Sequence, residues 1–314
     1  GYVVLAIKRA LNIGGNYEEV IYTPYTPELD SQVLRKEGFD YLTDLLKTAR
    51  EELASGGVTS LAVPGQEIAK GVPPDLALKL VICEQVDPGV FKARSAKLAA
   101  EKNIDPRKAD VLVMKEMTNQ GLTSVGANRE YARVYSKSRS GARGLFQLMP
   151  RTYEELQGKL FRNAQLEEDF ATGAAEHLNA AKAALLLFDS DYENALTDQL
   201  LNARHKRTLI NNEKALGMYL AACYNAGSTS VRATMRERGG NWPQHIPDET
   251  KDYVRKFLAL EALFGGQEIA RSAQPERPLA KEGEIEDRDR DAKRNRRDIP
   301  TELLGNSRSI AMQH

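Results

Sequence analysis

Two glutamates each follow a proline by ten residues and end a stretch that has helical spacing. Glu116 follows Pro106 in this way, and Glu84 follows Pro74 at the end of a run of apolar residues. A nearly apolar setting raises the pKa of a carboxyl group, so that it stays protonated near neutral pH and can donate a proton. Three residues share the predicted helical face of Glu116: Ala109, Leu112 and Val113.

Three later segments combine small residues with polar side chains that suit ligand binding. They read GARGLFQLMP at 141–150, AACYNAG at 221–227 and IPDETKDYV at 246–254. Because glycine has no Cβ, Gly141 and Gly144 let the backbone pass close to a ligand. A phenol beside an amide, as in the Tyr-Asn pair of the second segment, provides donors and acceptors for hydroxyl groups.

In this order, the three segments resemble signatures of the soluble lytic transglycosylase and goose-type lysozyme superfamily. The family patterns are GA-x-GLMQ-x-MP, AAYNAG and P-x-ET-x-x-YV, and the resemblance covers roughly residues 90–265. It implies a mainly α, lysozyme-like lobe with extra N-terminal helices and a charged C-terminal tail. It also implies cleavage of the MurNAc–GlcNAc bond of peptidoglycan to a 1,6-anhydro product, by one glutamate and without a metal or other cofactor.

The resemblance assigns substrate-binding roles to residues of the three segments and to one serine before them. Phe146 stands where the family usually has a methionine, which keeps an apolar wall but changes its shape. Trp242, the single tryptophan, has two interpretations, a platform for stacking a sugar or a core anchor. The residues expected to bind substrate are Ser138, Gln147, Tyr224, Asn225 and Tyr253.

The position of the acid departs from the family pattern, in which a Glu-Ser pair ends an apolar helix about a dozen residues before GA-x-G. Glu130 lies nearest, but its surroundings are polar. We predict Glu116 as the acid, because its gap to Gly141 is the shorter of the remaining two and an I-x-P pattern precedes its helix. Glu84 is the alternative, because its helix is more apolar and its continuation to Pro88 echoes E-S-x-F-N-P.

Charge and composition restrict the partners. Lys plus Arg and Asp plus Glu are equal, at 44 each, which argues against nucleic acid as the main partner. No stretch approaches the ~20 apolar residues of a transmembrane helix. The scattered histidines show no metal-ligand spacing, and Cys83 and Cys223 lie in apolar helical runs, where we expect buried free thiols, with a disulfide as the alternative.

The substrate implied by the resemblance lies outside the cytoplasmic membrane, so we expect action in the periplasm or cell wall. Delivery by a phage particle or a secretion apparatus would make a signal peptide unnecessary. The missing Glu-Ser and a polar insertion at 194–212 favour one alternative to an active transglycosylase, a weakly active or inactive lysozyme-like component of a virion or secretion machine. A true muramidase is a further alternative, which its water-added products would distinguish.

Composition divides the chain into an N-terminal extension (1–60), a helical domain (61–270) and a tail of alternating acids and bases (271–314) that has little to bury. We expect the extension, with one amphipathic helix around 39–53, and the tail to dock on partner chains or a second copy, the tail being disordered otherwise. A hairpin is expected within 120–140. The other predicted helices cover about 74–85, 90–103, 106–119, 150–159, 168–188, 213–226 and 249–264.

Overall fold

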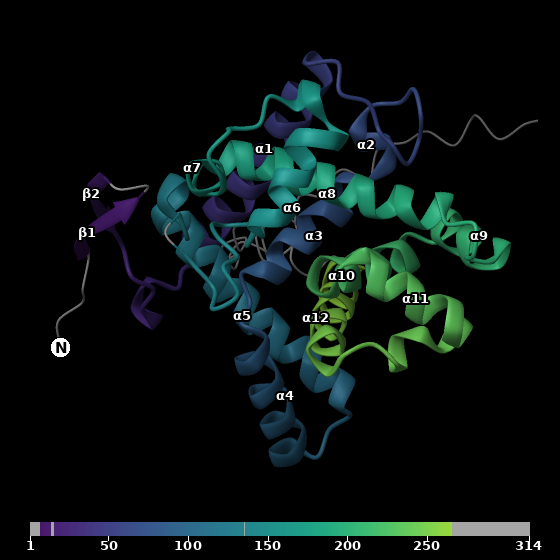
Figure 1. Ribbon diagram of the computed structural model, residues 1–314. Coiled ribbons are helices and arrows are strands. Elements are labelled where there is room, and N and C mark those ends of the chain that lie inside the picture. Colours follow the sequence, from purple (N-terminus) through teal and green to yellow (C-terminus); the bar gives the residue numbers. More distant parts are fainter. Residues whose placement is uncertain (1–6, 14–15, 135, 266–314) are drawn as a thin grey trace, which may run out of the picture. The chain divides into compact units, whose positions relative to one another are not determined.

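The computed structural model describes residues 7–13, 16–134 and 136–265, and these are mainly helical (Figure 1). The predicted mainly α class is therefore confirmed. The helices are α1 (Gln32–Ser55), α2 (Ile68–Gly71), α3 (Pro74–Glu84), α4 (Pro88–Lys102), α5 (Pro106–Asn128), α6 (Pro150–Glu155), α7 (Phe170–Ala175), α8 (His177–Thr197), α9 (Ala203–Asn211), α10 (Glu213–Ala226), α11 (Ser228–Arg238) and α12 (Asp248–Gly265).

Short helical turns and one two-stranded sheet complete the described elements. The turns are η1 (Pro27–Leu29), η2 (Arg129–Tyr131), the π-helical η3 (Leu156–Leu160), η4 (Arg162–Ala164) and η5 (Gly239–Gln244). Strands β1 (Ile7–Ile13) and β2 (Asn16–Tyr22) pair antiparallel, with Ile7 opposite Tyr22. The charged segment 271–314 lies outside the described residues.

Proline and aspartate together start two helices at the predicted places. Asp87 accepts a hydrogen bond from the backbone of α4, and Asp105 does the same for α5. Each aspartate precedes a proline at the first helical position, where the missing N–H is no loss and the fixed φ already suits a helix. The polar insertion at 194–212 contains the end of α8 and the short helix α9.

The hairpin expected within 120–140 is wrong, because α5 continues to Asn128. The hairpin of the described residues lies instead at β1 and β2, where no strand was expected. The extra turns of α5 are stabilised by packing, since Leu122 and Val125 are buried in the core. Burial of these two side chains outweighs the weak helical preference of the surrounding threonines, serine and glycines.

Two glycines let α1 and α5 meet backbone to backbone. A Cβ on Gly38 of α1 would lie 2.0 Å from the carbonyl oxygen of Leu122, and one on Gly126 of α5 would lie 2.0 Å from that of Leu34. Helix α1 thus shares one core with the helices that follow it. The segment before α1 also contacts α5 of the same chain, where the Thr23 backbone donates to Asn128 Oδ1 and the Asn128 amide donates to the Thr23 carbonyl. The sequence predicts instead that this extension docks on a partner chain or a second copy.

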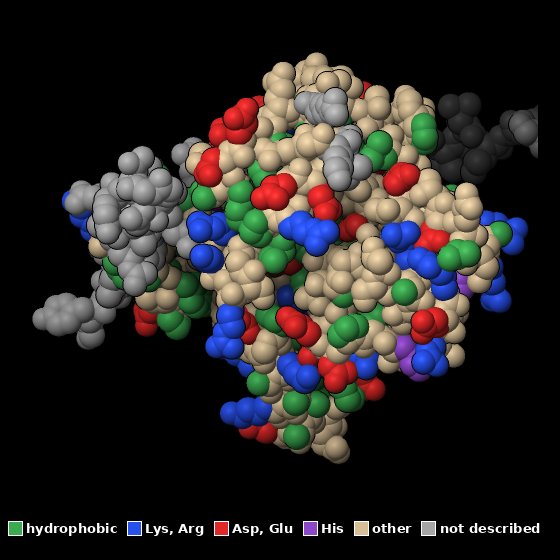
Figure 2. Space-filling model, viewed as in Figure 1, with side chains coloured by type: hydrophobic (Ala, Val, Ile, Leu, Met, Phe, Trp, Pro, Cys, Tyr) green, Lys and Arg blue, Asp and Glu red, His purple; other side chains and the backbone are tan. Residues whose placement is uncertain are grey.

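The core and surface bear on two further expectations. Cys83 and Cys223 are buried and free, as predicted for free thiols. Within the described ranges, none of the helices combines the length and hydropathy needed to cross a membrane. Figure 2 shows Lys and Arg side chains interspersed with Asp and Glu over the visible face of the helices.

Gly38→Ala should destabilise the protein by at least about 2 kcal/mol, because the new methyl group must push α1 and α5 apart. Urea unfolding followed by circular dichroism measures the change. Gly240→Ala is the matched control, since a Cβ there meets nothing within 4 Å. Equal stabilities of the two variants would contradict the close contact of the two backbones.

Candidate functional site

Glu84 is the last residue of α3, a helix whose preceding residues are buried from Leu76 to Cys83. Helix α3 contacts α1, α10 and α12 (Figure 1). The Glu84 side chain is half-buried, and its Oε1 accepts a hydrogen bond from the Tyr253 hydroxyl of α12. Burial raises the pKa of Glu84, although the charge of Lys256, the bond from Tyr253 and the charge of Arg133 act in the opposite direction.

Two cations satisfy the carbonyl groups at the end of α3. Helix C-termini leave such groups without intrahelical partners, and cations are favoured there by the helix dipole. Here Lys256 and Arg133 donate hydrogen bonds to these backbone carbonyls. Lys256 Nζ donates to the carbonyls of Cys83 and Val86, both at 2.8 Å, and the Arg133 guanidinium donates to those of Glu84 and Gln85, at 2.7 and 3.0 Å.

The first motif segment forms a tight loop beside the end of α3. Gly144 has a φ of 75°, and a Cβ there would lie 1.8 Å from the Ala174 carbonyl oxygen of α7. The requirement for glycine is therefore steric as well as conformational. The Gln85 amide donates to the Leu145 carbonyl at 3.0 Å, which ties the loop to α3.

Gln147 and Ser138 are engaged within this loop. The Gln147 amide donates to Ser136 Oγ at 3.1 Å and to the Gly144 carbonyl at 2.8 Å. Ser138 Oγ accepts from the Ala142 backbone at 3.0 Å. In this structure both side chains therefore make hydrogen bonds within the loop.

Tyr224 of α10 connects the first motif segment to the third. Its hydroxyl donates to the Phe146 carbonyl, and its ring centroid lies 6.5 Å from that of Tyr253. Burial, followed by the charges of Glu84 and Asp191, raises the pKa of Tyr224. All three motif segments thus converge on Glu84.

The remaining expected residues are placed as follows. Asn225 is exposed, and its Oδ1 accepts from the Thr250 hydroxyl at 2.7 Å, which links the second and third motif segments. Trp242 has 6% of its surface exposed and belongs to the core cluster. Of its two interpretations, the structure supports the core anchor.

The contacts of Glu116 are with residues other than those of the cluster of Glu84, Tyr224 and Tyr253. Its side chain is 59% exposed, and it bonds Arg94 at 2.8 Å and Gln120 at 3.0 Å. The helical face was misjudged, because Ala109 and Val113 are buried whereas Leu112, one turn before Glu116, is 45% exposed. The geometry therefore favours Glu84, the alternative, over Glu116.

A polar cavity of about 810 Å³ lies beside Tyr224 and runs between the Met149–Leu156 segment, α8 and the start of α11. Its lining includes Asn225, Arg151, Ser228 and the buried Asp191. Burial raises the pKa of Asp191 to about 7, although a hydrogen bond from Ser228 and the charge of Arg232 oppose this. A cavity of this size and polarity can hold a hydroxyl-rich ligand next to the Glu84 cluster.

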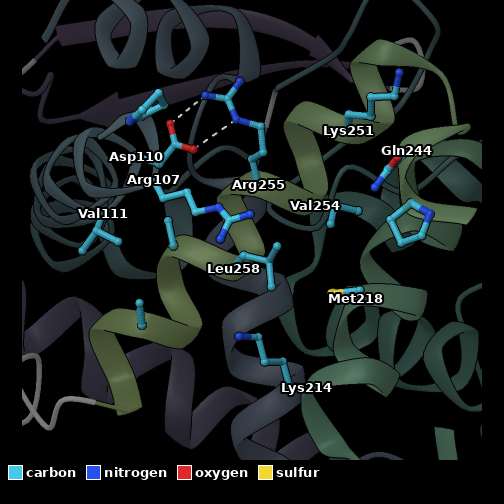
Figure 3. A pocket seen from close by; sticks show the side chains of 14 residues that line it. Arg107, Asp110, Val111, Lys214, Met218, Gln244, Lys251, Val254, Arg255 and Leu258 are labelled. Atoms are coloured by element: carbon cyan, nitrogen blue, oxygen red, sulfur yellow. Dashed lines mark hydrogen bonds and ion pairs between the residues drawn. The ribbon is translucent and has the colours of Figure 1, made fainter. Parts of the chain in front are cut away.

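A second cavity, of about 920 Å³, lies between α5, α10, η5 and α12, and its lining includes none of the expected site residues (Figure 3).

In the part of the chain that the structure describes, no group of three or more His, Cys, Asp or Glu side chains is arranged to hold a metal ion. Comparisons of the chain with protein-family models, curated proteins and solved structures give no match.

Sequence reasoning missed Lys256 and Arg133. Lys256 could have been found, because it follows Tyr253 by three residues and interrupts a buried face of α12. Arg133 has no such signal, since it follows η2 in an irregular segment and adopts a φ of 56°. Its place beside Glu84 depends on the path of the backbone.

Glu84→Gln should stabilise the protein increasingly as the pH rises above 4.5, the ordinary pKa of this side chain. As the pH rises, the unfolded chain releases the Glu84 proton at a lower pH than the folded chain does. The free energy of unfolding of the wild type therefore falls until the pH passes the raised pKa of the folded state. Glutamine does not titrate. Denaturant unfolding over a pH series measures the difference, with the exposed Glu116→Gln as control. A difference that shrinks with pH would contradict the raised pKa.

Proposed function

We propose that the chain is a peptidoglycan lytic transglycosylase with a lysozyme-like lobe, in which Glu84 is the acid and then the base. The observation that carries the proposal is the convergence of the three motif segments on one half-buried carboxyl group. Tyr253 bonds that carboxyl directly, and Tyr224 lies beside Tyr253 and holds the loop at Phe146. Burial raises the pKa of Glu84, which is the direction that a proton donor requires.

In the proposed reaction Glu84 begins protonated and donates its proton to the glycosidic oxygen as the bond to C1 of MurNAc breaks. The resulting carboxylate takes the proton of the MurNAc 6-hydroxyl, whose oxygen bonds C1 and closes the 1,6-anhydro ring. Atoms balance without a water molecule. The Tyr253 hydroxyl can donate to Glu84 in both states, and it stabilises the carboxylate more strongly.

The polar cavity beside Tyr224 supports a glycan strand as the substrate. Asn225 stands at its rim, and Arg151 and Ser228 provide donors for hydroxyl and acetamido oxygens. Because peptidoglycan lies outside the cytoplasmic membrane, we place the action at the cell wall, with a phage particle or secretion apparatus as the means of delivery.

Asp191 favours a true muramidase as the second candidate. Hydrolases commonly use a second carboxylate to hold a water molecule or attack the sugar. Asp191 lines the same cavity as Tyr224 and lies near enough for its charge to affect the Tyr224 hydroxyl. With a pKa of about 7, Asp191 is ionised in part at neutral pH.

Glu84→Gln should lower the rate of glycan cleavage by about 100-fold or more, the usual contribution of a general acid. The measurement is digestion of purified sacculi with mass analysis of the released muropeptides. Glu116→Gln is the matched control, because it makes the same change on an exposed side chain and should retain wild-type activity.

The products separate the candidate functions. Anhydro-muropeptides support the transglycosylase, and water-added products that disappear in Asp191→Asn indicate the muramidase. Sacculi left intact by the wild-type protein would overturn the proposal in favour of a lysozyme-like structural component. Loss of activity in Glu116→Gln with full activity in Glu84→Gln would overturn the assignment of the acid.

A further inference from the structure

Lys256 is a buried cation that the proposed reaction leaves without a role. Only 1% of its surface is exposed, although it stands on α12 three residues after Tyr253. Burying an ammonium group is costly unless its donors are satisfied. Burial accordingly lowers the pKa of Lys256, whereas nearby Cys83 and Glu84 act to raise it.

The position of Lys256 depends on contacts that hold α12 from two sides. On the side facing α5, Arg255 forms a two-fold ion pair with Asp110, at 2.7 and 3.1 Å (Figure 3). On the side facing α3, Glu261 of α12 pairs with Lys79. These pairs fix the rotation of α12, so that the residue after Arg255 is directed at the end of α3.

We propose that Lys256 is a positioning residue for Glu84, which holds the last turn of α3 through its carbonyl groups and places the carboxyl group against Tyr253. Its Nζ bonds the carbonyls of Cys83 and Val86, the residues immediately before and two after Glu84. It also lies 4.4 Å from the centroid of the Tyr253 ring, so one ammonium group contacts the backbone on both sides of Glu84 and the ring of its hydrogen-bond partner.

Lys256 acts on Glu84 through the backbone and through its charge. Among the described residues, the hydrogen bonds of its Nζ go to carbonyl groups, and none goes to the Glu84 carboxyl. The carboxyl oxygens therefore stay available to Tyr253 and to a substrate. Five other groups with a charge or a titratable proton act on Glu84 or on its hydroxyl partner Tyr253: Lys256, Arg133, Tyr253 itself, Tyr224 and the Cys83 thiol.

The charge matters because α3 directs the negative end of its dipole at its own C-terminal residue. Without a nearby cation, both this dipole and burial would disfavour the Glu84 carboxylate. That carboxylate is the base of the second half of the reaction, so this role for Lys256 rests on the proposed function. A lysine supplies the charge as a compact group with three donors, which fits the narrow space between two carbonyls and a ring.

The test compares Lys256→Met with Lys79→Met in the full chain. Both variants remove a buried lysine from the contact between α3 and α12, but Lys79 pairs with Glu261 and is not among the charges that shift the pKa of Glu84. We expect Lys256→Met to lower kcat on sacculi about tenfold or more with little change in KM, as for a misplaced catalytic group. Its alkaline limb of activity should move to higher pH, and Lys79→Met should keep the wild-type pH profile.

An NMR titration of the Glu84 carboxyl, assigned by comparison with Glu84→Gln, gives a readout that does not require activity. Loss of the cation should raise the midpoint of Glu84 in Lys256→Met, and Lys256→Arg should restore it at least in part. An unchanged midpoint, or equal shifts in both methionine variants, would overturn the inference.

Two further outcomes are separable. If Lys256→Met fails to fold, Lys256→Gln keeps a donor without the charge, and its titration decides the question in the same way. If the wild-type protein leaves sacculi intact, the proposed function fails, while the NMR titration still tests whether Lys256 controls Glu84.

Discussion

The burial of one carboxyl group at the C-terminal end of an apolar helix is the constraint on which the site depends. Helix α3 places Glu84 where both desolvation and the helix dipole disfavour its charge, and where the last carbonyl groups need donors. Lys256 and Arg133 donate to these carbonyl groups, and their charges partly offset the effect of burial on the Glu84 carboxylate. Because Lys256 stands on α12 and Arg133 follows η2, the end of α3 has both cations only when α12 and the segment after α5 are in place.

Much of the helical scaffold could be predicted, since apolar spacing and proline starts are local signals. The choice between Glu116 and Glu84 could not be made from spacing along the chain. After α4 and α5 the chain returns to the end of α3. There Arg133 donates to the Glu84 carbonyl, and Gln85 donates to the Leu145 carbonyl. A long gap in sequence therefore corresponds to direct contact.

The other errors share a physical cause, which is that tertiary contacts outweigh local preference. The segment after Thr118 has polar and small residues, yet it is helical because Leu122 and Val125 are buried and Gly126 fits against α1. Leu112 was assigned to a buried face, but the neighbours of α5 cover the face of Ala109 and Val113 instead. Which stripe of a weakly amphipathic helix is buried depends on the helices around it.

The contact of α1 with α5 at Gly126 has a mechanical consequence for the chemistry. Arg133 follows Gly126 by only seven residues, through the end of α5 and the short turn of η2. Since two backbones in contact have no soft side chains between them, any displacement of α1 passes into α5 and onward to the Arg133 guanidinium. Although α1 carries no reactive group, its position against α5 thus affects where the Arg133 guanidinium lies relative to Glu84.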